Sequence, residues 1–370
     1  MSERKADSQS NLTWRRMLLL IPFFGFTILI VTRFANITDL VRTLGQGNWF
    51  WIAAAVLTHV LYFYINAVMF KYSFATVDVK SSANELFGML LASLFINAVF
   101  PIGGAAGAAV FIDYAEQKDQ SGGRAAVGVL LELVADLSTL LPFLIFAMIY
   151  LAGQGKFQIL FIVGVAFFLI YILGLTAILV VSGQNEEKTH DVMEWIQKAL
   201  NKLGGLVHHP NLISDQWVDR TTHEFVQGAS TIRDRPKDFT RMLIWAMVMH
   251  VVNLVGLYFF FLGYNQPVRL GTLVAAFGLG IVFFVVTVVP QGVGAVEGVM
   301  GLVFISEGIP GPVAAAITFA YRGVNFWIPV LAGLFYFRRT SFAKGEEIGG
   351  ADKKAENEAP ADVQEKVTHR

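Results

Sequence analysis

The chain of 370 residues is 55% hydrophobic and only 15% charged, a composition typical of an integral membrane protein rather than a soluble one. Lys and Arg together number 28, as do Asp and Glu, and this balance gives no reason to expect nucleic-acid binding. The absence of cysteine excludes disulfides, thiol catalysis and cysteine-ligated metal sites.

The first part of the chain joins a basic tail to apolar runs long enough to cross a bilayer. Residues 1–16 are polar, with basic residues just before the first apolar run, which predicts a cytoplasmic N-terminal tail. That run lacks a small-residue cleavage site and is expected to be a retained helix rather than a signal peptide. Spans of the roughly 20 residues that a crossing needs are predicted at 17–34, 49–70, 127–151, 157–182, 242–263 and 312–337.

Two apolar stretches are interrupted by proline and glycine. Residues 95–111 read FINAVFPIGGAAGAAVF and residues 285–299 read VVTVVPQGVGAVEGV, with Pro101 and Pro290 189 positions apart. Broken backbone in hydrocarbon needs partners from protein or from a water-filled cavity. Paired breaks in two halves of a membrane protein indicate a transport site, although a pair of kinked helices would leave the same pattern.

Two topologies fit these runs. In the first, segments 85–100 and 271–289 cross fully, which gives eight crossings and places the connection 183–241 outside. In the second, each break is the tip of a re-entrant helical hairpin, which gives about six spanning helices and two hairpins. The second topology places most loop Lys and Arg on the cytoplasmic side, as the positive-inside rule favours, although this difference rests on the connection 183–241 alone. We therefore expect an all-α polytopic membrane protein with two re-entrant hairpins.

The hairpin topology predicts an inverted repeat within a transmembrane domain at 17–340. In repeat one, at about 49–151, the hairpin would enter the membrane from the cytoplasm. In repeat two, at about 242–337, it would enter from outside. In the cytoplasmic connection 183–241, an apolar stripe at 192–203 predicts a helix lying on the membrane or packed on its neighbours. Residues 341–370 contain few apolar residues, which predicts a disordered tail on the cytoplasmic side.

Two carboxylates lie within the predicted span 127–151. Glu132 and Asp136 are four residues apart and therefore share a helix face. An aspartate at this depth costs about 2.5–3.5 kcal/mol on insertion scales, so such groups face the bundle interior or a cavity. A proton or cation relay, a partner for a basic group and a structural ion pair are all compatible with this spacing.

A basic residue lies well inside the last predicted span. Arg322 follows Tyr321 there, and its planar guanidinium can bind two oxygens of a phosphate at once. A salt bridge to Glu297, just after the second break, or to Glu132 is the structural alternative. The two roles are compatible if the carboxylate pairs with the arginine when the site is empty.

The first break contains an asparagine, and both breaks contain glycines. Asn97 precedes Pro101 by one helical turn and could satisfy carbonyls that the break leaves free. A half-helix beginning after either glycine cluster would point its N–H groups toward the membrane middle and form an anion site. Close helix packing explains the glycines equally well. These glycines are Gly103, Gly104, Gly292 and Gly294.

Signatures of most enzyme classes are missing from the sequence. There is no Walker loop, G-x-S-x-G, H-E-x-x-H or paired-aspartate motif. His59 and His250 lie in spans without the spacing of a metal site, so neither a metal nor another cofactor is expected. An integral-membrane transferase that uses a prenyl-phosphate lipid would need a carboxylate near the interface, for which Asp113 and Glu116 are the candidates.

The motifs at both breaks and in two helices resemble the membrane region of lysylphosphatidylglycerol synthase and its stand-alone, flippase-like relatives. They are NAVFPIGG at 97–104, ELVAD at 132–136, PQGVGAVEG at 290–298 and the Tyr321–Arg322 pair, and the resemblance covers about 15–340. Leu133 departs from the pattern, because an arginine is expected after Glu132 in this family. The synthase's soluble acyltransferase-like domain does not follow here, so the resemblance does not imply lysyl transfer.

The resemblance implies translocation of a lipid between re-entrant helices that surround a headgroup cavity. The expected protein is a lipid flippase or lipid transporter, not an enzyme, in the plasma (inner) membrane of a bacterium or archaeon. Its substrate would be a phosphate-containing lipid, with or without an aminoacyl group. The alternative is a non-catalytic membrane partner that anchors a separate lipid or glycan synthase. Membrane lipids, such a synthase and a second copy of the chain are the partners considered.

Overall fold

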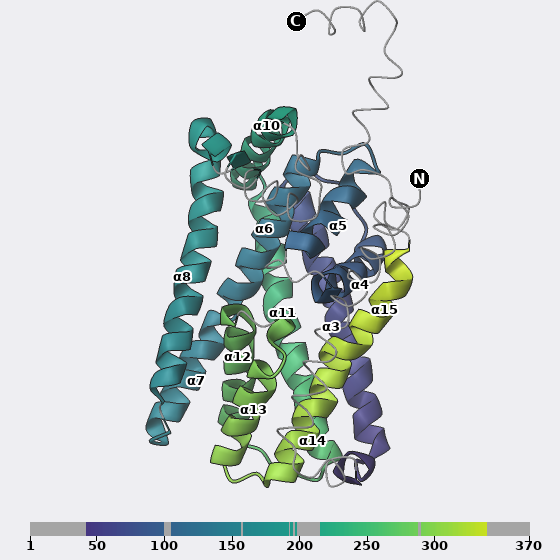
Figure 1. Cartoon of the computed structure of the whole chain (residues 1–370), viewed down its shortest axis with the longest axis vertical. Coiled ribbons are helices and arrows are strands. Elements are labelled where there is room, and N and C mark those ends of the chain that lie inside the picture. Colours follow the sequence, from purple (N-terminus) through teal and green to yellow (C-terminus); the bar gives the residue numbers. More distant parts are fainter. Residues whose placement is uncertain are drawn as a thin grey trace, which may run out of the picture.

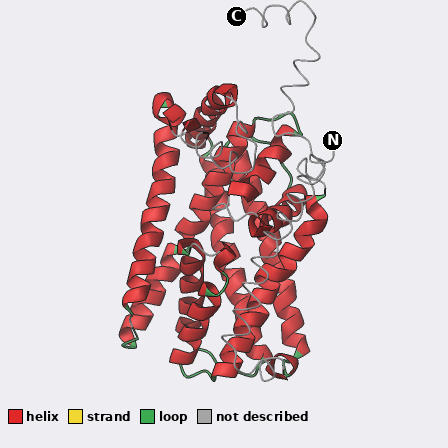
Figure 2. Ribbon diagram, in the orientation of Figure 1, coloured by secondary structure: helices red, strands yellow, loops and turns green. Residues whose placement is uncertain are grey.

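The computed structural model describes residues 42–99, 105–156, 158–191, 193–194, 197, 215–287 and 290–338. Within these ranges the regular elements are helices, which run mostly along the long axis of the molecule (Figures 1 and 2). The tails 1–16 and 341–370, the first predicted span 17–34, most of the stripe 192–203, and Gly103 and Gly104 lie outside the described residues.

The helices fall into two halves separated by a connection. The first half contains α3 (Trp49–Thr76), α4 (Ala83–Val99), α5 (Ala105–Glu116), α6 (Gly122–Thr139) and α7 (Leu141–Gly153). Between the halves lie a further long helix, α8 (Ile159–Ser182), and then, within the connection 183–241, α10 (Asp215–Thr231) and the 3-10 turn η1 (Ile232–Asp234). The second half contains α11 (Pro236–Gly263), α12 (Leu270–Val286), the 3-10 turn η2 (Pro290–Gly292), α13 (Ala295–Ser306), α14 (Gly311–Arg322), the π-helical turn η3 (Gly323–Trp327) and α15 (Ile328–Phe337).

The two halves repeat one series of helix lengths. Helices α3 and α11 have 28 residues each, α4 and α12 have 17, and α5 and α13 have 12. The last span of each half is broken and resumes at a turn that contains proline, Pro142 at the start of α7 and Pro329 at the start of α15. Proline suits the first turn of a helix because no intrahelical acceptor is needed for its missing N–H.

Each half contains a short hairpin that turns back near the middle of the molecule. Figure 1 shows α4 entering from the end where α10 lies and α5 returning to that end, whereas α12 and α13 enter from and return to the opposite end. We call α4–α5 hairpin 1 and α12–α13 hairpin 2. Limbs of 17 and 12 residues extend about 25 and 18 Å, less than the roughly 30 Å of a hydrocarbon core. The prediction of an all-α protein with two re-entrant hairpins and an inverted repeat is confirmed, and the eight-crossing topology is wrong.

Four helical segments of the described chain are long and apolar enough to cross a membrane. These are Trp49–Thr76, Gly122–Gly153, Ile159–Ser182 and Pro236–Gly263. The α14–η3–α15 series rises from the end opposite α10 along the side of the bundle (Figure 1), where the sequence predicts the span 312–337. Helix α11 begins at Pro236, earlier than the expected 242, because its polar first turns continue the helix beyond the apolar run.

The α3–α11 pair forms an antiparallel centre. At one end the Asn48 amide donates to the Gly263 carbonyl at 2.7 Å, and at the other the Arg235 guanidinium pairs with Asp78. Between these ends the helices approach closely at Gly256, where a Cβ atom would meet the His59 ring. The pair therefore fixes the axis about which the hairpins are arranged.

The first limb of each hairpin packs on the other half of the molecule. Helix α4 lies along α15, and α12 lies along α7. Gly333 on α15 admits the Leu91 carbonyl of α4, and Gly271 on α12 admits the Tyr150 ring of α7. Because each hairpin leans on the broken span of the opposite half, movement of one half relative to the other must change both contacts.

Candidate functional site

The tip of hairpin 2 has an unusual backbone. Gln291, Gly292 and Gly294 adopt positive φ values of 55°, 63° and 86°. At Gly292 a Cβ atom would lie 3.0 Å from the Phe284 Cα and 2.8 Å from a Val296 methyl carbon, so glycine is required by both conformation and space. Helix α13 begins directly after this turn, at Ala295.

A buried ion pair joins this tip to the end of α14. The Arg322 Nε donates to Glu297 Oε1 at 2.6 Å, and an Nη of the same side chain donates to the Gln291 carbonyl at 3.0 Å. The other Glu297 oxygen accepts from the Gly294 amide at 2.6 Å. The Arg322 and Glu297 side chains are 7% and 8% exposed, and the guanidinium carbon lies 4.7 Å from the centre of the Phe326 ring. Charge-assisted hydrogen bonds therefore determine the geometry of the tip.

Tyr321 points into a second polar cluster between α11 and the last broken span. Its hydroxyl donates to Asn253 Oδ1 at 3.1 Å and accepts from Asn325 at 2.7 Å, and Asn325 also approaches Asn253 at 3.3 Å. On α3, the centre of the His59 ring lies 5.5 Å from that of Tyr321 and 6.3 Å from that of Tyr62. Neither asparagine was predicted from the sequence, although a carboxamide inside an otherwise apolar helix is a signal that could have identified both.

Glu132 and Asp136 face the interior from α6 but do not pair with Arg322. Glu132 is 7% exposed and has no hydrogen-bond or ion-pair partner among the described residues. An Asp136 carboxylate oxygen lies 3.4 Å from the His250 Nε2, and the same nitrogen is 2.9 Å from the Asp136 carbonyl. Of the two carboxylates proposed as partners of Arg322, the structure selects Glu297.

Tyr62 connects the carboxylates of α6 with the asparagine cluster. It interacts electrostatically with Glu132, Asp136 and Tyr321. A series of polar side chains, joined in part by electrostatic interaction rather than by hydrogen bonds, therefore runs across the centre of the bundle from α6 through α3 and α11 to the end of α14.

Asn97 joins the two limbs of hairpin 1. Its side-chain oxygen accepts from the Gly107 amide at 2.7 Å and thus ties α4 to α5. The expected role toward the carbonyls of the break stays a prediction, because residues 100–104 lie outside the described residues. Helix α4 also contacts η2, so hairpin 1 reaches the turn of hairpin 2.

The two halves differ in the charges that they place at equivalent positions. Arg322 is the twelfth residue of α14, and the twelfth residue of α6 is Leu133. Glu297 is the third residue of α13, and the third residue of α5 is Gly107. Counted from the helix starts, the ion pair therefore has no oppositely charged counterpart in the first half, where Glu132 lies beside the position that corresponds to Arg322.

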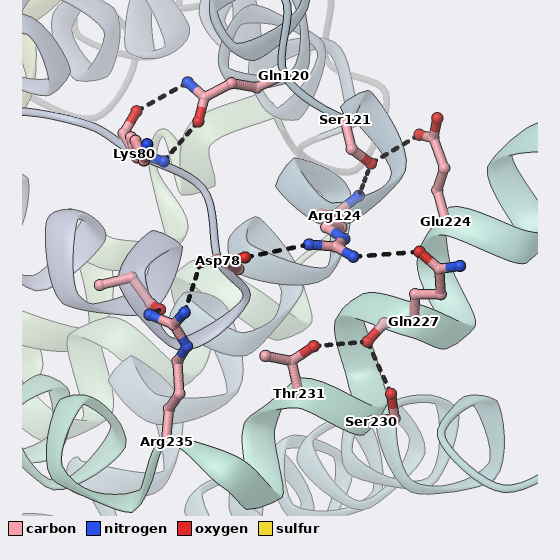
Figure 3. Close-up of polar contacts among 11 residues, drawn as sticks. Asp78, Lys80, Gln120, Ser121, Arg124, Glu224, Gln227, Ser230, Thr231 and Arg235 are labelled. Atoms are coloured by element: carbon pink, nitrogen blue, oxygen red, sulfur yellow. Dashed lines mark hydrogen bonds and ion pairs between the residues drawn. The ribbon is translucent and has the colours of Figure 1, made fainter.

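The α10 end of the bundle is held by a separate polar network (Figure 3). Asp78 after α3 pairs with both Arg124 and Arg235. Ser121 and the Gly123 amide at the start of α6 donate to Glu224 on α10 at 2.8 and 2.9 Å. These bonds dock α10 on the first turn of α6, the helix that carries Glu132 and Asp136.

The entrance of hairpin 1 lies at this same end. Lys118 after α5 pairs with Glu85 in the first turn of α4. The hydrogen bond from Lys118, followed by that from Ser82, lowers the pKa of Glu85 to about 2. Of the two carboxylates considered for a transferase, Asp113 is buried and accepts from Gln117 at 2.8 Å, while Glu116 packs against Gly122.

Histidines and acidic residues of the described chain do not gather into a metal site. No group of three or more such side chains is placed to hold a metal ion within these residues. His59 lies 2.8 Å from the Ala55 carbonyl through its Nδ1, whereas His250 interacts with Asp136. The two histidines therefore serve different parts of the polar series.

Opposed re-entrant hairpins, an inverted repeat and a buried polar series define a polytopic helical membrane protein. Residues 17–333 match the family described as the lysylphosphatidylglycerol synthase TM region, and the chain belongs to that family. It is similar to the UPF0104 membrane protein MJ1595 of Methanocaldococcus jannaschii, with 23% identity across 87% of this chain and 94% of that protein. It is also similar to the UPF0104 membrane protein PH1989 of Pyrococcus horikoshii, with 20% identity across 86% of this chain and 95% of that protein.

Proposed function

We propose that the protein is a lipid flippase or lipid transporter that carries a phosphate-containing headgroup between its two repeats. The observation that carries this proposal is the buried arginine at the tip of hairpin 2. Arg322 lies at a break in the membrane helices, and hairpin 1 reaches the same turn from the opposite side. A cation in this position needs an anionic partner. A headgroup phosphate can take the place of Glu297 in that role.

The chemistry of Arg322 suits a phosphate. Two of its nitrogens bond to Glu297 and to the Gln291 carbonyl, and a phosphate offers oxygens that could replace both. Glu297 then serves as the internal anion that neutralises the arginine while the site is empty. When a headgroup displaces it, Glu297 keeps its second bond, to the Gly294 amide.

The backbone at the tip adds a second source of positive potential. Helix α13 begins at Ala295 near the middle of the molecule and runs back to the end opposite α10 (Figure 1). Its first N–H groups therefore point toward the centre, where the positive end of the helix dipole favours an anion. The headgroup would meet the arginine and the start of this helix together.

The lipid tails would remain at the lateral surface of the bundle. An apolar groove of about 650 Å³ runs along α7, α11 and α12. Because the chain spans a membrane, hydrocarbon covers this surface and an acyl chain can occupy the groove. Its lining residues include Phe143, Phe146, Val251, Val255, Leu270 and Leu273.

On this proposal the protein is not an enzyme and uses no cofactor. Its partners are lipids of a prokaryotic plasma membrane, and both chain termini lie on the cytoplasmic side.

The alternative is a membrane anchor for a separate lipid or glycan synthase. It is favoured by α10, a polar helix docked on α6 through Glu224. As an anchor, the protein would tolerate Arg322→Ala and lose its function when the exposed face of α10 is changed.

The test is headgroup translocation in liposomes that contain the purified protein. A fluorescent phospholipid and a membrane-impermeant quencher measure the fraction of lipid that changes leaflet. We expect translocation by the wild type and its loss in Arg322→Ala. The matched control is Arg241→Ala, because that arginine side chain is 57% exposed on the surface. If folded wild-type protein moves none of several phosphate-containing lipids, the proposal is wrong.

A further inference from the structure

Glu132 is a carboxylate buried in the bundle without a hydrogen-bond or ion-pair partner among the described residues. It is 7% exposed, and no described residue donates a hydrogen bond to it or pairs with it. An uncompensated charge in such a place costs several kcal/mol. In this buried arrangement the neutral, protonated form of the side chain is therefore favoured.

Asp136 supplies a second carboxyl one helical turn away. An oxygen of this side chain is buried without a well-formed hydrogen bond, 3.4 Å from the His250 Nε2. Because His250 also contacts the Asp136 carbonyl through that nitrogen, its N–H is directed to the backbone. Two like charges at this separation disfavour each other, so the pair is suited to hold one proton.

The groups that face this pair come from three helices. Asp136 interacts with Glu132 along α6, His250 faces Asp136 from α11, and Tyr62 faces both carboxyls from α3. A hard cation such as Ca²⁺ binds through six to eight oxygen ligands. The described histidines and acidic residues form no group of three or more that could hold a metal. A proton needs only one carboxylate oxygen, so this site can hold it without further ligands.

We infer that Glu132 and Asp136 form a proton-binding site that couples proton movement to passage of the headgroup at Arg322. Asp136, whose side chain is 27% exposed, accepts a proton from water and exchanges it with Glu132. Only O–H bonds form and break, and the neutral acid returns its proton to water on release. The coupling rests on the proposed transport function, whereas proton binding at Glu132 does not.

The polar series across the bundle connects this site to the arginine. Tyr62 interacts electrostatically with both carboxyls and with Tyr321, the residue before Arg322, and the Tyr321 hydroxyl donates to Asn253. A change of charge at Glu132 alters the field at Tyr62 and so can favour one arrangement of the last broken span over another. Coupling of two sites requires such an element, whose equilibrium both sites affect.

Two measurements on reconstituted protein test the inference separately from the proposed function. Infrared difference spectra at varied pH report the carboxyl band of a protonated acid without any need for transport. We expect a titrating band in the wild type that Glu132→Gln removes and Glu132→Asp shifts. The matched control is Glu186→Gln, since that carboxylate is 60% exposed. If no band depends on Glu132, proton binding there is disproved even if lipid translocation is present.

The second measurement imposes a pH gradient across liposomes that contain a reporter lipid. With one proton per lipid, a gradient of one pH unit shifts the steady-state leaflet ratio by up to about tenfold, because each factor of ten in proton activity contributes about 1.4 kcal/mol. Glu132→Gln should lose this gradient-driven shift of the leaflet ratio. An even distribution in a translocating wild type, or a shift driven by sodium at constant pH, would overturn the coupling. If the wild type translocates no lipid, the transport function and the coupling both fail, and the infrared result alone decides proton binding.

Discussion

Arg322 and Glu297 form an ion pair of 2.6 Å that joins the end of α14 to the first turn of α13, and each side chain is more than nine-tenths buried. The pair therefore closes hairpin 2 against the last broken span. The same two residues stabilise the tip and hold the charges that a headgroup would displace. Substitution at either position is expected to change both stability and transport.

A double-mutant cycle separates the pair from its surroundings. Arg322→Ala and Glu297→Ala should each destabilise the protein by about 3–5 kcal/mol, because each leaves a buried charge without its partner. The double variant should lose less free energy of unfolding than the two single variants lose together, since no charge is left unpaired. Unfolding in detergent measures each value. The exposed pair Arg241–Asp238 is the control, with an expected coupling below about 1 kcal/mol. Additive losses at Arg322 and Glu297 would contradict the prediction.

The sequence located the two breaks, although it did not show that they are hairpins. Pro101 and Pro290 mark the breaks because proline and the following glycines cannot continue a helix without lost hydrogen bonds. The sequence could not decide between two topologies by loop charge. The Lys118–Glu85 ion pair decides it for hairpin 1, because it joins the end of α5 to the start of α4, and Figure 1 shows α13 returning to the end from which α12 enters. The packing of α4 on α15 and α12 on α7 was not predictable, because nothing in an apolar helix specifies its neighbour.

The site was predicted in part for similar reasons. Charged residues in apolar spans stand out, so Arg322, Glu297, Glu132 and Asp136 were identified from the sequence. Which carboxylate pairs with the arginine depends on the turn at Gln291, whose φ of 55° no local pattern predicts. The roles assigned to these residues stay predictions, whereas their positions are given by the fold.

The turn of hairpin 2 should be sensitive to a single methyl group. Gly292→Ala would place a Cβ atom 3.0 Å from the Phe284 backbone at a φ of 63°, which costs about 1–3 kcal/mol in strain. Gly298→Ala is the matched control, because nothing lies within 4 Å of a Cβ there and alanine favours a helix interior by about 0.5–1 kcal/mol. The midpoint temperature of thermal unfolding should therefore fall for Gly292→Ala and rise slightly for Gly298→Ala. Equal effects would contradict the conformation of the tip.

The hairpin topology can be tested with single cysteines, since the natural chain has none. Lys80→Cys and Gln117→Cys flank hairpin 1, and both positions are exposed at the α10 end. Arg269→Cys and Pro310→Cys flank hairpin 2 at the opposite end. A membrane-impermeant maleimide should label each pair from one side of the membrane and the two pairs from opposite sides. Labelling of Lys80→Cys and Gln117→Cys from different sides would show that hairpin 1 crosses the bilayer.

Glu307 fastens the loop between α13 and α14 to the first half. Its side chain is 3% exposed and accepts hydrogen bonds from Lys156 at 2.6 Å, Tyr150 at 2.7 Å and Thr272 at 3.0 Å. Burial raises the pKa of this carboxyl, but the three donors outweigh burial, and the pKa lies below its ordinary value. The ionised form is therefore the one that the folded protein stabilises.

The stability supplied by Glu307 should consequently depend on pH. A carboxyl with a lowered pKa in the folded state contributes fully above its unfolded pKa and loses its contribution as pH falls through the folded value. At pH 7, Glu307→Gln should destabilise the protein by about 1.5–3 kcal/mol, the range for hydrogen bonds to a charged group. The difference from wild type should shrink as pH falls below the ordinary pKa of 4.5. Paired thermal unfolding scans across pH measure this difference, with Glu186→Gln as the exposed control. A difference that stays constant to the lowest pH at which both proteins fold would show that the Glu307 charge contributes nothing.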